Sequence, residues 1–146
     1  MDILVNAVLT PRRSHQAPPQ PSADKMAAAG LRAFQRIAAA WRLSVDDQLN
    51  LLGMPPRSTF YGWIKDPDSA RVSRDTLERL SNILGIYKSL QILIPEAEAA
   101  DNWVRNPNAA PLFGGHSALA HMLAGNVSDL NAVRRHLDAA RGGGWS

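Results

Sequence analysis

The long apolar segment between Ser73 and Pro95 constrains the fold of this chain more than any other feature of its sequence. Apolar side chains recur there at three- and four-residue spacing, which predicts a helix over residues 73–94. Ser73 suits the N-cap, and proline ends such a helix. The apolar positions cover more than one stripe of the helix: Leu77, Leu80, Ile83, Leu84, Ile86, Tyr87, Leu90, Leu93 and Ile94. Such a helix must bury more than one side, so either the C-terminal region or a second copy of the chain covers the second side.

The segment before this helix begins with a stretch that is poor in helical signals. Residues 1–9 are apolar and suit a short strand, whereas residues 11–22 contain four prolines and predict an extended linker. We therefore expect residues 1–21 to be a flexible N-terminal segment. A helix follows, with Ser22 as its N-cap and an alanine-rich sequence. Its predicted buried stripe consists of Leu31, Phe34, Ile37, Ala38 and Trp41.

Two short helices are expected next, the first capped by Ser44 and ended by Gly53. Pro55 and Pro56 suit the first turn of the second helix, RSTFYGWIK, which stops before Asp66-Pro67 and a loop over residues 67–72. This arrangement predicts a helix-turn-helix with Leu49, Leu52, Phe60, Trp63 and Ile64 inside. The outward residues Arg57, Ser58, Thr59, Tyr61 and Lys65 are the candidate DNA contacts. The alternative is an ordinary polar surface on a core helix.

The chain after Pro95 predicts three further helices. An acidic helix over residues 96–105 ends at Asn106-Pro107, and the loop PNAAPLFGG follows. Ser117 suits the cap of a helix that stops before Gly125, and Ser128 suits the cap of the last one. No stretch is rich in strand signals, so the predicted fold class is all-α.

The composition excludes several function classes. The 146 residues include no cysteine, which removes disulfides, thiol nucleophiles and thiolate metal sites. No apolar run approaches the ~20 residues of a spanning helix. The first residues make a poor signal peptide, so we expect a cytoplasmic protein. Residues 1–94 carry 12 Lys/Arg against 8 Asp/Glu, and residues 95–146 carry 4 against 5. The basic excess favours a nucleic-acid partner for the first part.

Nothing in the sequence predicts catalysis, a metal or a cofactor. His116 and His121 are five residues apart, where one helix face would need four. The neighbouring carboxylates Asp46 and Asp47 belong to a first helical turn, where they interact favourably with the positive end of the helix dipole. We expect Trp41 and Trp63 to be core residues; Trp103 suits the core and an interface equally.

Three stretches resemble the Xre/MbcA/ParS antitoxins, and together they cover residues 30–146. They are LNLLGMPPRSTFYGWIKDP, RDTLERLSNILGIYKSLQILIP and NWVRNPNAAPLFGGHSALAHMLAGNVSDLNAVRRHLDAARGGGW. The most specific elements are LGIYKSL, the W-x₃-PN element from Trp103 to Asn108, the Gly114-Gly115 pair and Gly125. Two positions depart from the family pattern: Ala118 replaces a usual proline, and Gly62 replaces a larger polar residue.

The resemblance implies a helical protein in two parts. Residues 22–94 would hold the helix-turn-helix and dimerisation helices, bind the operator of a type II toxin–antitoxin operon and repress it. Residues 95–146 would bind a RES-domain toxin, which is similar in fold to ADP-ribosyltransferases and consumes NAD⁺, and would cover its active site without chemistry of their own. A homodimer within a toxin–antitoxin hetero-oligomer is the implied assembly. A stand-alone helix-turn-helix regulator is the alternative.

The candidate toxin-binding residues are Trp103, Arg105, Asn106, Phe113, Arg141, Gly142, Gly143, Gly144, Trp145 and Ser146. The tail suits this role because glycines let the backbone approach a narrow cleft closely. Trp145 would supply a large apolar anchor, and Arg141 a cation. The alternative is a frayed chain end that carries a tryptophan.

Overall fold

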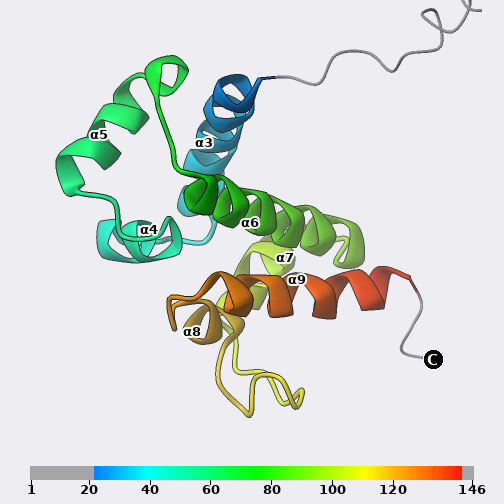
Figure 1. Cartoon of the computed structure of the whole chain (residues 1–146). Helices are drawn as coiled ribbons and strands as arrows, with labels where there is room; N and C mark the ends of the chain where they lie inside the picture. Colours follow the sequence, from blue (N-terminus) through cyan, green and yellow to red (C-terminus); the bar gives the residue numbers. More distant parts are fainter. Residues whose placement is uncertain (1–21, 143–146) are drawn as a thin grey trace, which may run out of the picture.

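The computed structural model describes residues 22–142, and this part of the chain contains seven α-helices, two short 3₁₀-helices and no β-strand (Figure 1). The predicted all-α fold is therefore confirmed. The α-helices are α3 (Ala23–Ala40), α4 (Val45–Leu51), α5 (Arg57–Lys65), α6 (Arg74–Leu93), α7 (Ala97–Asn102), α8 (Ala118–Met122) and α9 (Val127–Arg141). The expectations for residues 1–21 and for the tail from Gly143 to Ser146 lie outside the described residues.

Serine side chains cap four of these helices, as the sequence predicts. The Oγ of Ser22 accepts the N–H of Lys25 at 3.3 Å, and that of Ser44 accepts the N–H of Asp47 at 3.1 Å. Ser73 caps α6 and Ser117 caps α8 in the same way, at 3.1 and 3.0 Å. Each cap satisfies a backbone donor that has no partner within the helix.

The start of α9 corrects a prediction, because Asn126 is its N-cap and Ser128 lies within its first turn. Asp129 stands three residues after Asn126, and its Oδ2 accepts the Asn126 N–H at 3.2 Å. This reciprocal bond is the capping-box arrangement, which fixes the helix start two residues earlier than a serine cap would.

Other boundaries shift by smaller amounts. Pro56 is the extended N-cap residue of α5, so both prolines precede that helix and lie outside its first turn. The expected loop over residues 67–72 contains a 3₁₀-helix, η1 (Pro67–Ser69), and the expected acidic helix divides into α7 and a second 3₁₀-helix, η2 (Trp103–Arg105).

Helix α6 runs through the middle of the described chain (Figure 1). α3 crosses one side of it, and α9 packs along another. The C-terminal region thus covers the second apolar side within the same chain, which is one of the two alternatives that the sequence leaves open. Side chains along α6 are almost fully buried as a result, namely Leu80, Ile83, Ile86 and Leu90.

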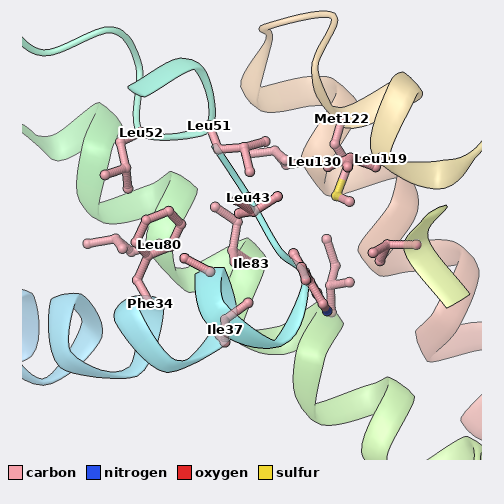
Figure 2. Packing of buried hydrophobic residues seen from close by; sticks show 14 of the residues in the cluster. Phe34, Ile37, Leu43, Leu51, Leu52, Leu80, Ile83, Leu119, Met122 and Leu130 are labelled. Carbon is pink, nitrogen blue, oxygen red and sulfur yellow. The ribbon is translucent and has the colours of Figure 1, made fainter. Parts of the chain in front are cut away.

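One continuous core joins the N-terminal helices to the C-terminal ones. Phe34 and Ile37 of α3 lie near Leu80 and Ile83 of α6, and Leu51 of α4 reaches toward Leu119, Met122 and Leu130 (Figure 2). Trp41 is 0% exposed and Trp63 is 7% exposed, which confirms both as core residues. Among residues 22–142, no helix is long and apolar enough to cross a membrane.

The turn after α4 requires glycine for two reasons. Gly53 has a φ of +93°, a conformation that side chains disfavour. A Cβ atom there would lie 2.8 Å from Oδ2 of Asp75 and 3.1 Å from Nε of Arg79. Gly125, at a φ of +102°, would meet nothing within 4 Å. A comparison of substitutions at Gly53 and Gly125 therefore separates the cost of backbone strain from the cost of crowding.

We expect Gly53→Ala to lower the free energy of unfolding more than Gly125→Ala does. Both changes cost about 1–2 kcal/mol of backbone strain, and only the first also displaces Asp75 and Arg79. Urea unfolding of the two variants measures the difference. Equal losses would contradict the crowding at Gly53.

Candidate nucleic-acid and protein-binding surfaces

The helix-turn-helix consists of α4, the turn at residues 52–56 and α5. Phe60 and Trp63 bury the inner face of α5 at 2% and 7% exposure, and Ile64 is half-buried. The turn includes Met54, which has a φ of +62° and is 67% exposed. The inner side chains thus fix α5 against the core and leave its other face free.

All five candidate DNA contacts are exposed on α5, as the sequence predicts: Arg57, Ser58, Thr59, Tyr61 and Lys65. No side chain caps the N-terminus of α5, and no acidic residue lies in its first turn. Free backbone N–H groups and the positive end of the helix dipole make such a terminus suitable for phosphate.

The Arg57 guanidinium forms an ion pair with Asp46 in the first turn of α4. Both side chains are more than half exposed, and a pair of this kind contributes only about 0–1 kcal/mol. A phosphate can therefore replace the carboxylate at little cost. Sequence reasoning misses this pair because Asp46 and Arg57 are 11 residues apart.

A second cation, Arg32 of α3, forms an ion pair with η1. Arg32 of α3 pairs with Asp68 at 2.6 Å, and the hydrogen bond to Asp68 raises the pKa of Arg32 above its ordinary value. The Arg32 guanidinium is therefore already paired with a carboxylate, whereas Lys65, at the end of α5, forms no ion pair with any residue between 22 and 142.

A cluster of aromatic rings lies in the C-terminal part. The Trp103 ring contacts Phe113 edge-on at 5.8 Å and stacks on His136 at 6.5 Å. Phe113 also lies 5.2 Å from His136 and 5.9 Å from His121. Phe113 is only 3% exposed, whereas Trp103 is half-buried. Phe113 thus holds the loop in place, and Trp103 keeps an accessible edge.

Arg105 is engaged within the chain as well. Its Nε donates to the Trp41 carbonyl oxygen at 2.8 Å, and its Nη2 donates to that of Arg42 at 2.7 Å. These are carbonyl oxygens at the C-terminal end of α3, where a cation is favoured. Arg105 therefore fastens the C-terminal part to α3, and the neighbouring Asn106 is exposed.

The W-x₃-PN element ends at Asn108, which organises the loop that follows. Its Oδ1 accepts the Ala110 N–H at 3.0 Å, and its carbonyl oxygen accepts the Gly115 N–H at 2.8 Å. The Asn108 N–H in turn donates to the His116 carbonyl oxygen at 3.0 Å. These bonds close the loop onto itself and give it a defined shape.

An apolar groove of about 300 Å³ lies between the end of α6, this loop and α9. Its lining is Leu90, Leu93, Ile94, Trp103, Asn108, Ala110, His136, Leu137 and Ala140. Of the predicted toxin contacts between residues 22 and 142, the groove includes only Trp103. Arg141 and Gly142 are exposed just beyond it, and Arg141 Nη1 donates to Ser89 Oγ at 3.3 Å. The lining comes from three stretches that are distant in sequence, so no local spacing would have located the groove.

A polar junction, defined here as Asn50, Thr76 and Arg79, binds backbone carbonyls just after α4 and α8. Arg79 is 8% exposed; its Nη2 donates to the Gly125 carbonyl oxygen at 3.0 Å and its Nε to Asp75 at 2.8 Å. Asn50 donates to the Leu123 carbonyl oxygen at 3.1 Å, and Thr76 to that of Leu52 at 2.9 Å. Side chains of α4 and α6 thus hold the C-terminal ends of α4 and α8 close together.

Within residues 22–142, no three His, Cys, Asp or Glu side chains gather as a metal would require. His121 lies near Asp129, with Nε2 and Oδ1 3.8 Å apart, and His136 belongs to the aromatic cluster.

Comparison with known proteins matches both parts of the chain. Residues 22–85 match the antitoxin Xre-like helix-turn-helix domain, and residues 89–143 match the antitoxin Xre/MbcA/ParS C-terminal toxin-binding domain. A Sinorhizobium fredii protein named uncharacterized protein y4oB is 52% identical over 124 residues, which cover 84% of this chain and 93% of that protein.

A helix-turn-helix joined to a toxin-binding domain defines an antitoxin of a toxin–antitoxin system. This chain belongs to the Xre/MbcA/ParS-type antitoxins. The family resemblance that the sequence indicates is thereby confirmed.

We expect the free energy of unfolding to fall as the pH decreases through about 6.5. Burial lowers the pKa of His136 below its ordinary value, so the unfolded chain takes up this proton at a higher pH than the folded chain does. His136 thus favours the folded state fully only above about pH 6.5. Urea unfolding between about pH 8 and pH 5 should show a smaller pH dependence for His136→Gln.

The matched control for this experiment is His116→Gln, which removes an imidazole that is exposed in the loop. A His136→Gln protein whose pH dependence equals that of the wild type would contradict the role of His136.

Proposed function

We propose that this antitoxin neutralises a RES-domain toxin that degrades NAD⁺ and represses its own operon through α5. The observation that carries the proposal is the presence, in one chain, of an outward-facing helix-turn-helix and a matched toxin-binding domain. In this assignment residues 22–94 hold the DNA-binding and dimerisation helices, residues 95–146 bind the toxin, and the protein acts in the cytoplasm.

The DNA-binding half of the proposal is supported by the chemistry of α5. Its free face combines two hydroxyls, a phenol and an ammonium group with an uncapped helix N-terminus. Hydroxyl and ammonium groups bind phosphate oxygens, and arginine binds both phosphates and guanine edges. Tyr61, which is 51% exposed, adds a ring at the edge of this face.

The toxin-binding half is supported by the surface around the end of α9. The apolar groove, the half-buried Trp103 and the exposed Arg141 lie together there, and the chain continues from Gly142 into Gly143, Gly144, Trp145 and Ser146. An apolar surface next to a glycine-rich end with a tryptophan suits a partner that has a narrow cleft. The antitoxin would block the active site by occupying it, without chemistry of its own.

A homodimer is part of the proposed assembly. An apolar groove of about 290 Å³ lies between α3 and α6, lined by Met26, Ala29, Gly30, Leu77, Leu80, Ser81 and Leu84. Met26 is 49% exposed there. Pairing along this groove would present two copies of α5 to a palindromic operator.

We expect sedimentation of the isolated chain to show a dimer at micromolar concentration, because each copy offers the other an apolar surface. Leu84→Lys should shift the protein to the monomer, whereas Ala139→Lys, which introduces the same side chain at an exposed position of α9, is the control. A wild-type protein that is purely monomeric would contradict the dimer.

We expect Arg57→Ala and Lys65→Ala each to weaken binding of the protein to its promoter DNA. Each change removes one cation from the α5 face, so the slope of log K against log[salt] should decrease by about one. Fluorescence anisotropy over a range of salt concentrations measures both effects, and neutralisation of the toxin should be unchanged.

The matched control for these two variants is Arg135→Ala, which removes an exposed cation from α9. It should leave DNA binding as it is. Unchanged promoter affinity in both α5 variants would show that DNA binds elsewhere.

We expect deletion of residues 142–146 to restore activity to the toxin in the complex, because the glycine-rich tail would no longer occupy the active-site cleft of the toxin. NAD⁺ consumption by the co-purified product of the neighbouring gene measures this. Deletion of residues 2–6 at the other end is the control. Full suppression by the shortened chain would exclude the tail, and no suppression by the intact chain would favour a stand-alone regulator.

A further inference from the structure

Gly62 is a glycine for which the chain itself offers no structural reason. It lies inside α5 and is exposed, and a Cβ atom added there would meet nothing within 4 Å. The other two glycines inside described helices are different: a Cβ added at Gly30 would lie 3.5 Å from Leu80, and one added at Gly85 would lie 2.5 Å from Arg134. Gly62 also lacks the positive φ that explains Gly53 and Gly125.

A glycine inside a helix weakens it relative to alanine, because the unfolded chain loses more freedom on folding. The loss matters in α5, which has only nine residues and no side-chain cap. Since neither packing nor backbone conformation within the chain requires Gly62, we look for the reason in what contacts this helix from outside.

Gly62 occupies the middle of the exposed face of α5. At about 3.6 residues per turn, Ser58, Gly62 and Lys65 fall along one line, opposite the buried Phe60 and the half-buried Ile64. The larger Tyr61 borders this line on one side. The centre of the outward face is thus bare backbone between a hydroxyl and an ammonium group.

A shallow hollow of about 350 Å³ continues from this bare region toward η1. Thr59, Gly62 and Trp63 line it on the α5 side, and Asp66, Ser69, Ala70 and Arg71 line it on the other. The exposed surface of this hollow is mostly apolar, and the exposed Asp66, Ser69 and Arg71 stand at its rim. The line through Gly62 contains no apolar side chain, and its hydroxyl and ammonium groups suit a nucleic-acid surface.

We propose that Gly62 is the point of closest approach between α5 and the DNA duplex. The absence of a Cβ atom lets the helix backbone sit directly against the floor or rim of the major groove, with Ser58 and Lys65 reaching DNA on either side. This inference rests on the proposed function of α5 and adds the residue that sets how deeply the helix enters.

The test is Gly62→Ala, whose two expected effects have opposite signs. The free protein should become more stable, with Tm higher by about 2–4 °C, because alanine favours the helix and meets no neighbour. Affinity for a duplex that spans the promoter of its own gene should fall about tenfold or more, because the new methyl group holds the helix away from DNA. Gly62→Leu should weaken binding further.

Ala139→Gly is the matched control, because it makes the inverse change at an exposed position of α9. It should lower Tm and leave promoter affinity unchanged, which separates helix stability from DNA contact. Promoter binding by Gly62→Ala that equals wild-type binding would overturn the inference and leave the proposed function intact. Failure of the wild type to bind the promoter would overturn both. Weakened toxin neutralisation with unchanged DNA binding would assign Gly62 to a protein contact.

Discussion

The burial of two sides of α6 is the constraint on which the rest of the structure depends. A helix with apolar residues around so much of its surface is stable only when neighbours cover them, and α3 and α9 do so from different directions. The helix-turn-helix packs next to the first of these contacts, and the toxin-binding domain packs against the second. Both parts are therefore oriented by one shared helix.

Directional hydrogen bonds fix the relative position of the two parts, which apolar packing alone does not. Arg79 bonds to a carbonyl beyond α8, Asn50 bonds to one at the end of α8, and Arg105 bonds to two at the end of α3. Helix ends leave carbonyl oxygens without partners, and a buried guanidinium satisfies them while favouring one geometry. Apolar packing alone tolerates some sliding, whereas these bonds fix the register between the two parts.

Much of the fold was predictable because its signals are local. Serine caps, Gly53 and the spacing of apolar residues place most helices correctly, and the outward face of α5 follows from the same period. The start of α9 was misassigned because two adjacent caps compete, and only the Asp129 bond to Asn126 decides between them. The apolar groove, the Arg57–Asp46 pair and the internal use of Arg105 and Phe113 depend on residues that are distant in sequence. Local patterns carry no information about such contacts.

The fastening of Arg105 to the last carbonyls of α3 has an evolutionary consequence. Exchange of everything after Pro95 for another toxin-binding domain would preserve this fold only if the incoming piece also supplied a guanidinium for α3 and an apolar partner for α6. Substitutions at surface positions of the loop and of α9 should therefore change toxin specificity with less damage to the fold than an exchange of domains at Pro95.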